Sequence, residues 1–420
     1  MKKMIGFFCF ILLGLCLVSC MEEKPNQGNG DTPNIDKLPD DGAYDGEKKI
    51  VFWHTMNKDL QNVLQDAIDE FEKANAGWEI EAVQMGVMDQ ILEETMKSSS
   101  KPDLVYAYPE HVARYKEKNM IVNMNPYISD SKVGFSQEKQ KDFIKAFYEE
   151  GKSFGDGGMY SLPFSKASEV LYYYKNEVKD YPKTWEELED MGDSNSVTLR
   201  VESEIWLFQT LAHQSGADFT SLDDNHYIFD NPTNRKNVEM LKRLYNQHKL
   251  VTSQTDKASK WPLYQLASSG AIYWYINSLD ELKVAPIPTF EGKKRKAPFQ
   301  GPSLCMLKQH SVKQMKTWEF IKDYLLDTEF QAKFSMHSLF SPVVKSAYDV
   351  KDFTDWLKEN SAISSMMNIC KSYADDYYFN SPFVGIDKAS EEAGNIVINV
   401  LNGTKTIDEA FKDAIKNCNS

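Results

Sequence analysis

Near the start of the folded part of the chain, short apolar segments typical of strands take turns with stretches where apolar residues recur at helical spacing. Short segments rich in strand-forming residues lie at 49–54, 78–83 and 104–108. Between the first two, apolar residues recur at helical spacing and form one stripe, at Leu60, Val63, Leu64, Ala67, Ile68 and Phe71. A second helix is predicted at 88–98. Strand, helix, strand, helix, strand in this order predicts an α/β fold with a parallel sheet.

Two of these predicted strands end in side chains suited to a binding site. In open α/β sheets, ligands bind beyond the carboxyl ends of the strands. The first predicted strand leads to a site position at His54-Thr55, with Trp53 before it, and the third to one at Tyr108-Pro109. We therefore expect Trp53, His54 and Tyr108 near a ligand.

The rest of the chain is predicted to contain more helix. Capping signals mark helix starts at Thr184, Asn231, Ser311 and Thr406. An extended segment is predicted at 169–174, and further strands at 271–276, 283–287 and 303–307. This order predicts a second α/β domain that the chain enters after about residue 165, with at least one return to the first.

One aromatic residue stands out in the segment 271–276. Flat rings stack on sugar faces while keeping a polar edge, so carbohydrate sites use them. Ser268-Ser269-Gly270 reads as a helix stop, which places Trp274 at the end of a short strand. Because side chains alternate along a strand, Tyr273 and Tyr275 are expected on the opposite face from Trp274.

Charge and cysteine content exclude several classes of protein. The 48 basic and 62 acidic side chains give a net charge of −14, which argues against a nucleic-acid partner. Cys305, Cys370 and Cys418 are the only cysteines outside the first twenty residues, and their wide spacing fits neither a disulfide framework nor a zinc site. The sequence leaves open whether two of these three cysteines form one disulfide. No catalytic or cofactor motif is present, so we expect no cofactor and no metal.

The first twenty residues have the features of an export signal. Lys2 and Lys3 precede an apolar run at 5–18 that is short for a membrane-spanning helix. The run ends in Leu17-Val18-Ser19-Cys20, which resembles the bacterial lipobox, where cleavage before the cysteine exposes a thiol for lipid attachment. We expect a lipoprotein signal peptide at 1–19, and at 20–47 the lipidated Cys20 followed by a flexible tether rich in Pro, Gly, Asn and Asp.

Seven short motifs follow one another along the body of the chain. They are FWHTM at 52–56, LPFS at 162–165, LYYYKN at 171–176, PKTWEEL at 182–188, GPSL at 301–304, WEFI at 318–321 and SPVVKSA at 341–347. Together they resemble the extracellular solute-binding proteins of bacterial ABC importers, and most closely the branch that binds sugars and glycerol 3-phosphate.

The resemblance implies a two-lobe periplasmic-binding-protein-like fold of the class II type, with hinge strands and a central ligand cleft. The first part of lobe 1 is expected at 48–165, and lobe 2, with returns to lobe 1, at 166–420. The family pattern implies cleft positions at Ser165, at Trp274, at Gly301 with Pro302, and at Phe340, and we expect Ser165, Trp274, Gly301 and Phe340 to bind the ligand.

Two positions depart from the glycerol 3-phosphate branch. Where those members place an acidic residue after the third strand, this chain has Tyr108, with Glu110 two residues on. Where they place an arginine on the phosphate, it has Ser390, with Lys388 nearby. These departures favour a neutral sugar or polyol.

The resemblance therefore implies a monomeric binding protein, not an enzyme, that captures a sugar, polyol or related solute and delivers it to the permease subunits of an ABC transporter. The lipid on Cys20, a palmitate among its acyl chains, would hold it on the extracytoplasmic face of the cell membrane. Two alternatives stay open. A secreted glycoside hydrolase needs two carboxylates about 5 to 10 Å apart across the cleft, and a surface adhesion lipoprotein needs no closing cleft.

Overall fold

The computed structural model describes residues 37–191, 197–217, 219–221, 226–256 and 262–419. The predicted signal peptide, Cys20 and the first part of the predicted tether lie outside the described residues. Among the described residues, no helix is both long enough and apolar enough to cross a membrane.

The first sheet is built around the strands predicted near the start of the body. In spatial order it comprises β2 (Glu79–Gln84), β1 (Lys49–His54), β3 (Leu104–Ala107), β13 (Ser303–Met306) and β4 (Leu162–Pro163). β1 pairs in parallel with both β2 and β3, which confirms the predicted parallel sheet. β13 runs antiparallel to β3 and to β4.

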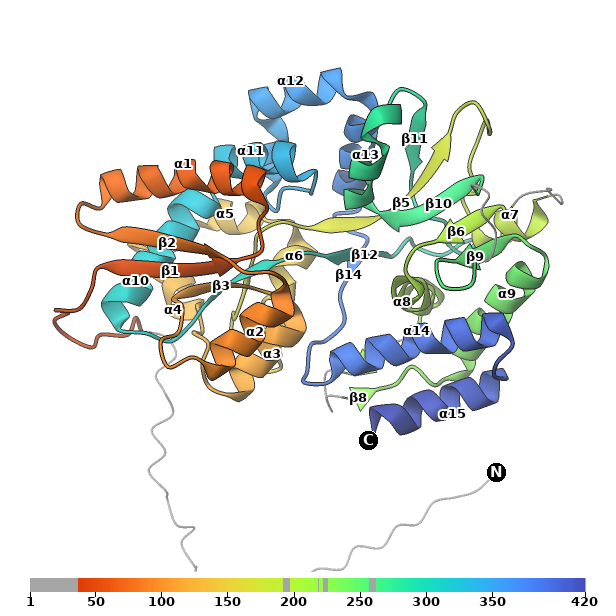
Figure 1. The fold of residues 1–420 in the computed structure, drawn as a ribbon, viewed down its shortest axis with the longest axis horizontal. Helices are drawn as coiled ribbons and strands as arrows, with labels where there is room; N and C mark the ends of the chain where they lie inside the picture. Colours follow the sequence, from red (N-terminus) through yellow and green to blue (C-terminus); the bar gives the residue numbers. More distant parts are fainter. Residues whose placement is uncertain (1–36, 192–196, 218, 222–225, 257–261, 420) are drawn as a thin grey trace, which may run out of the picture. The chain divides into compact units, whose positions relative to one another are not determined.

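Helices α1 (Lys58–Ala74) and α2 (Met88–Lys97) also form where the apolar stripes predict them. The Asn57 side chain caps α1 by accepting a hydrogen bond from the backbone N–H of Leu60. The buried residues of α1 are the predicted stripe from Val63 to Phe71, and the helix packs against α11 (Thr328–Ser338). Figure 1 shows α1 on one side of the first sheet and α2 on the other.

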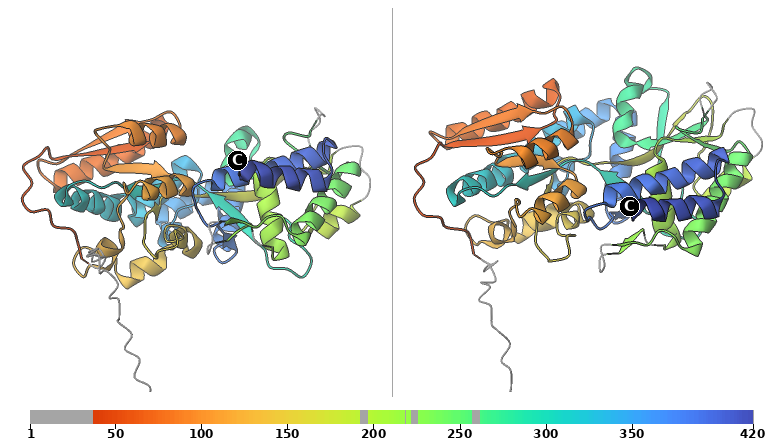
Figure 2. Two further views of the ribbon diagram at one scale, coloured as in Figure 1. Left: turned by 90° about the horizontal axis from the view of Figure 1, so that it is seen from below. Right: turned by 60° about the horizontal axis from the view of Figure 1, so that its bottom comes forward.

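The folded body has two halves: the first half is built around the first sheet, and the second half is built around a second sheet (Figure 1). Its spatial order is β14 (Tyr377–Tyr378), β12 (Ala297–Gln300), β5 (Ala167–Tyr174), β10 (Tyr264–Ser268), β6 (Leu199–Val201) and β9 (Leu250–Thr252), with β11 (Leu282–Ala285) also paired to β5. Helix α14 (Ile386–Asn402) packs against α8 (Glu204–Ser215), α9 (Pro232–Asn246) and α15 (Ile407–Cys418). Figure 2 shows α14 and α15 side by side.

The remaining elements connect these parts. They are α3 (Pro109–Glu117), α4 (Asn125–Ser129), α5 (Gln137–Asp142), α6 (Lys145–Glu150), α7 (Trp185–Asp190), β7 (Thr220–Ser221), β8 (His226–Tyr227), the 3-10 helices η1 (Ser269–Ser278) and η3 (Lys345–Asp349), α10 (Ser311–Phe320), the π-helical segment η2 (Ile321–Leu325), α12 (Lys351–Glu359) and α13 (Ser361–Ser372). The predicted capping residues Thr184, Asn231 and Thr406 precede α7, α9 and α15, and their side chains cap them. Ser311 is instead the first residue of α10, which the side chain of His310 caps.

Two chain segments that join the sheets lie against each other. The chain leaves β4 of the first sheet and enters β5 of the second through residues 164–166, and it returns from β12 to β13 through Gly301 and Pro302. The backbone N–H of Phe164 donates to the carbonyl of Pro302 at 3.3 Å. We call residues 164–166 and 301–302 the crossing segments. Gly301 has φ +152°, and a Cβ there would lie 2.0 Å from the carbonyl oxygen of Ser165, so only glycine fits.

The strand predicted at 271–276 is wrong, because this segment lies within the 3-10 helix η1. The Ser268 side chain accepts from the backbone N–H of Gly270, so the residues taken for a helix stop begin a helix instead. Periodicity cannot separate strand from helix in a short apolar run. Tyr273 and Trp274 are both exposed while Tyr275 is buried, which is not the alternation expected for a strand.

The end of the predicted tether contacts the body earlier than expected. Asp41 contacts the start of α10: its carboxylate accepts from the backbone N–H of Ser311 at 2.6 Å, and its own N–H donates to the Ser311 hydroxyl at 2.9 Å. The Tyr44 ring lies 4.9 Å from the ring of His310. The chain is therefore held to the first half from Asp41 rather than from residue 48.

Candidate ligand-binding cleft

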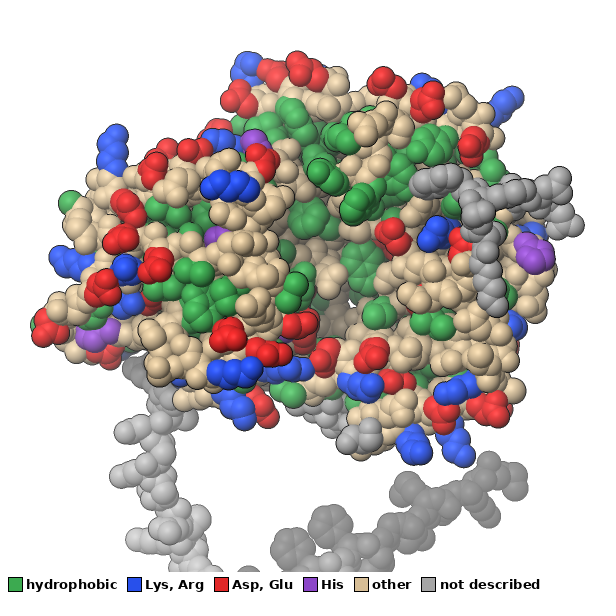
Figure 3. All heavy atoms as spheres, in the orientation of Figure 1, with side chains coloured by type: hydrophobic (Ala, Val, Ile, Leu, Met, Phe, Trp, Pro, Cys, Tyr) green, Lys and Arg blue, Asp and Glu red, His purple; other side chains and the backbone are tan. Residues whose placement is uncertain are grey.

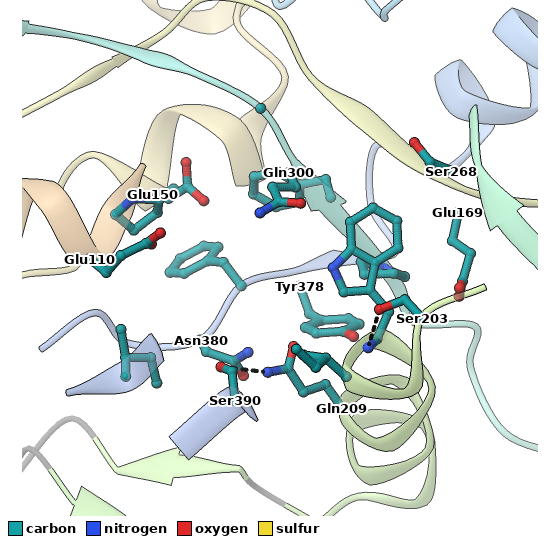
Figure 4. Close-up of a pocket in the computed structure, with 18 of the residues that line it drawn as sticks. Glu110, Glu150, Glu169, Ser203, Gln209, Ser268, Gln300, Tyr378, Asn380 and Ser390 are labelled. Atoms are coloured by element: carbon teal, nitrogen blue, oxygen red, sulfur yellow. Dashed lines mark hydrogen bonds between the residues drawn. The ribbon is translucent and has the colours of Figure 1, made fainter. Parts of the chain in front are cut away.

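A cavity of about 530 Å³ opens between residues of the two halves. The first half contributes Pro109 and Glu110 at the start of α3 and Glu150 at the end of α6. The second half contributes residues of β5, the β6–α8 turn, β10, β12, the segment after β14 and α14. The space-filling view shows the surface hollowed between the two halves (Figure 3), and Figure 4 shows the lining side chains from both sides.

Aromatic rings form the apolar part of the lining. They are Trp206, Phe299, Tyr378 and Phe379. The Tyr378 ring is fixed from behind, because its hydroxyl lies 3.0 Å from the Thr210 hydroxyl and its ring stacks on His213 with centroids 3.9 Å apart. A ring held in this way loses little conformational entropy when a ligand stacks on it.

Amide and hydroxyl groups form a second part of the lining. Gln209 donates from Nε2 to the Ser390 hydroxyl at 3.0 Å, which links α8 to α14 (Figure 4). The Ser203 hydroxyl accepts from the backbone N–H of Trp206 at 3.2 Å and caps α8, which leaves its own proton available to donate. Neutral polar groups of this kind orient a hydroxyl-rich ligand.

Five carboxyl groups complete the lining, and among the described residues there neither lysine nor arginine occurs. They are Glu110, Glu150, Glu169, Glu202 and Asp387. Asp387 has a cationic partner outside the lining, because Arg114 of α3 lies 2.7 Å from its carboxylate. This pair joins the two halves at the edge of the cleft.

Glu150 has a buried cationic partner at the crossing segments. Lys166 is fully buried, and its Nζ donates to the Glu150 carboxylate at 2.7 Å, to the carbonyl of Gly301 at 2.9 Å and to the Ser303 hydroxyl at 3.1 Å. One ammonium group therefore connects α6, both crossing segments and the start of β13.

Glu169 has no such partner. Its side chain is fully buried on β5, and neither carboxylate oxygen has a hydrogen-bond partner in the described structure. Burial, followed by the charge of Glu202, raises the pKa of Glu169 to about 8. Across the cleft, burial and the nearby carboxylates, Glu150 first among them, raise the pKa of Glu110 to about 7.

Of the seven binding residues predicted from the sequence, the structure places Gly301 in the lining of this cavity. Ser165 is buried in the neighbouring crossing segment, and Phe340 is half-buried beside Gly270. Trp274 is 80% exposed on η1 and is not part of the lining.

The three candidates at the ends of the first-sheet strands also lie outside the lining. His54 is buried, its Nδ1 accepts from the backbone N–H of Met56 at 3.1 Å, and burial lowers its pKa to about 4. Trp53 is half-buried. Tyr108 is half-buried at the start of α3, next to the lining residue Pro109.

Glu169 and Tyr378 were not predicted as site residues, and Trp206 was not singled out among the aromatic residues of the chain. A detectable signal existed for Glu169, because a lone carboxyl interrupts the otherwise uncharged strand Ala167–Tyr174. A charge placed inside a buried strand needs a functional or structural reason. The short strand Tyr377–Tyr378 carried no comparable signal.

Comparison with known families gives one match that covers more than half of the chain. The model of the family "Bacterial extracellular solute-binding protein" matches residues 66–363.

Curated relatives match a shorter part. The sn-glycerol-3-phosphate-binding periplasmic protein UgpB of Salmonella paratyphi A is 26% identical over 151 residues, which cover 34% of this chain and 34% of the relative. UgpB of Yersinia pestis is 25% identical over 150 residues, covering 33% and 34%. The match thus spans about a third of the length of these relatives.

Solved structures match over most of the chain. The cyclic alpha-maltosyl-1,6-maltose binding protein from Arthrobacter globiformis has a TM-score of 0.73 at 16% identity and covers 89% of this chain and 98% of its own. The sugar-binding protein MalE from Xanthomonas citri has a TM-score of 0.72 at 17% identity, covering 88% and 96%. UgpB from Mycobacterium tuberculosis, in complex with glycerophosphocholine, has a TM-score of 0.70 at 14% identity, covering 89% and 98%. These similarities confirm the predicted α/β fold of the periplasmic-binding-protein kind.

Proposed function

The chain belongs to the bacterial extracellular solute-binding protein family, and on that premise we propose that its cleft binds a small hydroxyl-rich solute without an anionic group. A sugar, a polyol or a related compound has this chemistry. The observation that carries the proposal is the lining of the cavity, where aromatic rings, amides and carboxyl groups surround about 530 Å³. Ligand pockets commonly measure about 300 to 1,000 Å³ and combine apolar walls with a few placed polar groups.

The charge of the lining supports the exclusion of phosphate esters. A phosphate would approach five carboxyl groups with no lysine or arginine among the described lining residues. Ser390 lines the cavity at the position where the resemblance implies a phosphate-binding arginine, and Lys388 is paired with Glu392 at 3.1 Å. Three of the compared proteins are named for glycerol 3-phosphate or were solved with glycerophosphocholine, whereas this chain, on our proposal, takes a ligand of different chemistry.

We further propose that the protein acts as a monomer, anchored through a lipid on Cys20 to the outer face of the cell membrane, and delivers the solute to the permease of an ABC importer. Release of the solute to a membrane partner needs a site that opens, and a site made by two halves joined at crossing segments allows such a motion.

A thermal-shift panel tests this function. The panel contains neutral mono- and oligosaccharides, polyols and amino sugars, and for each sugar its phosphate ester. A ligand at a hundredfold excess over its Kd stabilises the folded state by about 2.7 kcal/mol. We expect stabilisation by at least one unphosphorylated member and none by its ester. Stabilisation by esters alone, or by no member of the panel, would contradict the proposal.

A further inference from the structure

Among the five lining carboxyl groups of the described cleft, Glu169 alone is fully buried with both carboxylate oxygens unsatisfied. Glu150 is paired with Lys166 and Asp387 with Arg114, whereas Glu110 is half-buried and Glu202 is exposed to solvent. Leaving a buried polar group without hydrogen bonds costs about 1 to 3 kcal/mol, and more for a charged one, so this cost at Glu169 points to a group that arrives with the ligand.

The surroundings of Glu169 offer that group a shaped position. Glu202 and Ser203 follow β6, and Ser268 ends β10, so three neighbouring strands bring these side chains together. Figure 4 shows Glu169, Ser203 and Ser268 on one side of the cavity, opposite Glu110 and Glu150. We call the position bounded by Glu169, Glu202 and Ser203 the acidic subsite.

The groups facing Glu169 do not supply a cation. Glu202 approaches from the end of β6, and the hydroxyl groups of Tyr373 and Tyr378 approach from the end of α13 and from β14. Burial keeps the pKa of both tyrosines far above the physiological range, so they stay neutral. A neutral hydroxyl of the ligand would satisfy one acceptor, whereas an ammonium group has three donors and a charge that matches two carboxyl groups.

We propose that the acidic subsite binds a protonated amine of the solute, so that the ligand of this cleft is a hydroxyl-rich compound with a primary amine, such as an amino sugar. This rests on the proposed function of the cleft as the solute site. The aromatic rings of Trp206 and Tyr378 then contact the apolar faces of the sugar, and both the rings and the carboxyl groups favour a cation.

Binding of an amine also has a consequence for protons. With a pKa of about 8, Glu169 is mostly protonated in the free protein at pH 7. The ammonium group requires the ionised carboxylate, so each bound amine displaces the proton of Glu169 to the buffer. Amine affinity therefore rises with pH, by up to about tenfold per pH unit, over the range where Glu169 is protonated and the sugar amine is still charged, and the affinity of a neutral sugar does not rise.

Three disaccharides with the same β-1,4 backbone test the proposal by isothermal titration. They differ at carbon 2 of each sugar: cellobiose has a hydroxyl, N,N′-diacetylchitobiose an acetamide, and fully deacetylated chitobiose an amine. The monosaccharides glucose, N-acetylglucosamine and glucosamine form a second set. We expect the amine of at least one set to bind at least tenfold more tightly than its neutral partners at pH 7. We also expect its binding to release protons between pH 6 and pH 7, shown by heats that differ between buffers of different ionisation enthalpy.

Glu169→Gln keeps the shape of the side chain and removes its charge, and Glu359→Gln makes the same change at an exposed position on α12. We expect Glu169→Gln to abolish both the preference for the amine and the proton release, and Glu359→Gln to keep both. If Glu169→Gln lowers the melting temperature, Glu169→Asp, which keeps the charge, is expected to keep the preference.

The outcomes separate this proposal from the proposed function. Binding of neutral sugars equal to or tighter than that of the amines overturns the amine subsite and leaves the solute-binding function standing. Retention of the amine preference in Glu169→Gln overturns the subsite as well. Absence of binding by every member of both sets and of the thermal-shift panel overturns the function and the subsite together.

Discussion

Lys166 and Glu150 form a buried ion pair, with 2.7 Å between Nζ and the carboxylate, at the point where the chain passes from one half of the body to the other. The same ammonium group donates to the carbonyl of Gly301 in the second crossing segment. The carboxylate of Glu150 also lines the cleft. The ligand site and the connection between the halves thus share one electrostatic group.

Removing the cation of this pair should destabilise the protein. Lys166→Met leaves the Glu150 carboxylate buried without its cationic partner. Breaking a buried ion pair in this way costs about 3 to 5 kcal/mol of stability. We expect the double variant Lys166→Met with Glu150→Gln to recover much of that loss. Urea unfolding of the two variants and the wild type provides the free energies. Equal stability of wild type and Lys166→Met would show that the pair carries no net stabilisation.

The raised pKa of Glu169 predicts how stability depends on pH. The carboxyl ionises near pH 4.5 in the unfolded chain and near pH 8 in the folded protein, so the folded state holds an extra proton between these values. Stability linked to this proton is fully present below about pH 4.5 and is lost as the pH rises toward 8. The side chain in Glu169→Gln cannot ionise. As the pH rises through this window, the free energy of unfolding of the variant should therefore increase relative to that of the wild type by about 1.4 kcal/mol per pH unit.

Urea unfolding without ligand at pH 5, 6, 7 and 8 measures that difference. The exposed change Glu359→Gln should give a difference from wild type that does not vary with pH. Parallel pH profiles for Glu169→Gln and the wild type would mean that Glu169 titrates normally.

Two tryptophans should differ in their contribution to binding. Trp206 lines the cavity, so Trp206→Ala should weaken binding of the solute found in the panel by about 1 to 3 kcal/mol. Trp274 is 80% exposed and outside the lining, so Trp274→Ala should have a smaller effect on affinity and leave the melting temperature of the free protein unchanged. Titration calorimetry and thermal melting of both variants test this. A larger loss of affinity in Trp274→Ala would place the solute against η1 instead.

Much of the fold was accessible from the sequence because periodicity and caps are local. The stripe in α1, the strands β1 to β3 and the capping box at Thr406 follow from neighbouring residues alone. The cleft depends on how distant segments are arranged. Glu110, Glu169 and Tyr378 line one cavity only because the sheet topology brings their segments together. Trp274 was placed in a strand because its short apolar run has no diagnostic period.

The lipid anchor can be tested separately from the cleft. If Cys20 carries the lipid, Cys20→Ala should move the protein from the membrane fraction to the soluble secreted fraction with unchanged affinity for the solute. Immunoblotting of fractionated cells gives the distribution. A variant that stays in the membrane fraction would show that anchoring does not depend on Cys20.

In the proposed site, residues of both halves of the body hold one solute. Such a ligand binds the closed arrangement better than the open one and shifts the population toward it. Small-angle X-ray scattering of the protein with and without a saturating concentration of the solute found in the panel measures this directly. We expect a smaller radius of gyration in the bound state. A radius that stays the same while calorimetry shows full occupancy would contradict closure of the two halves on the solute.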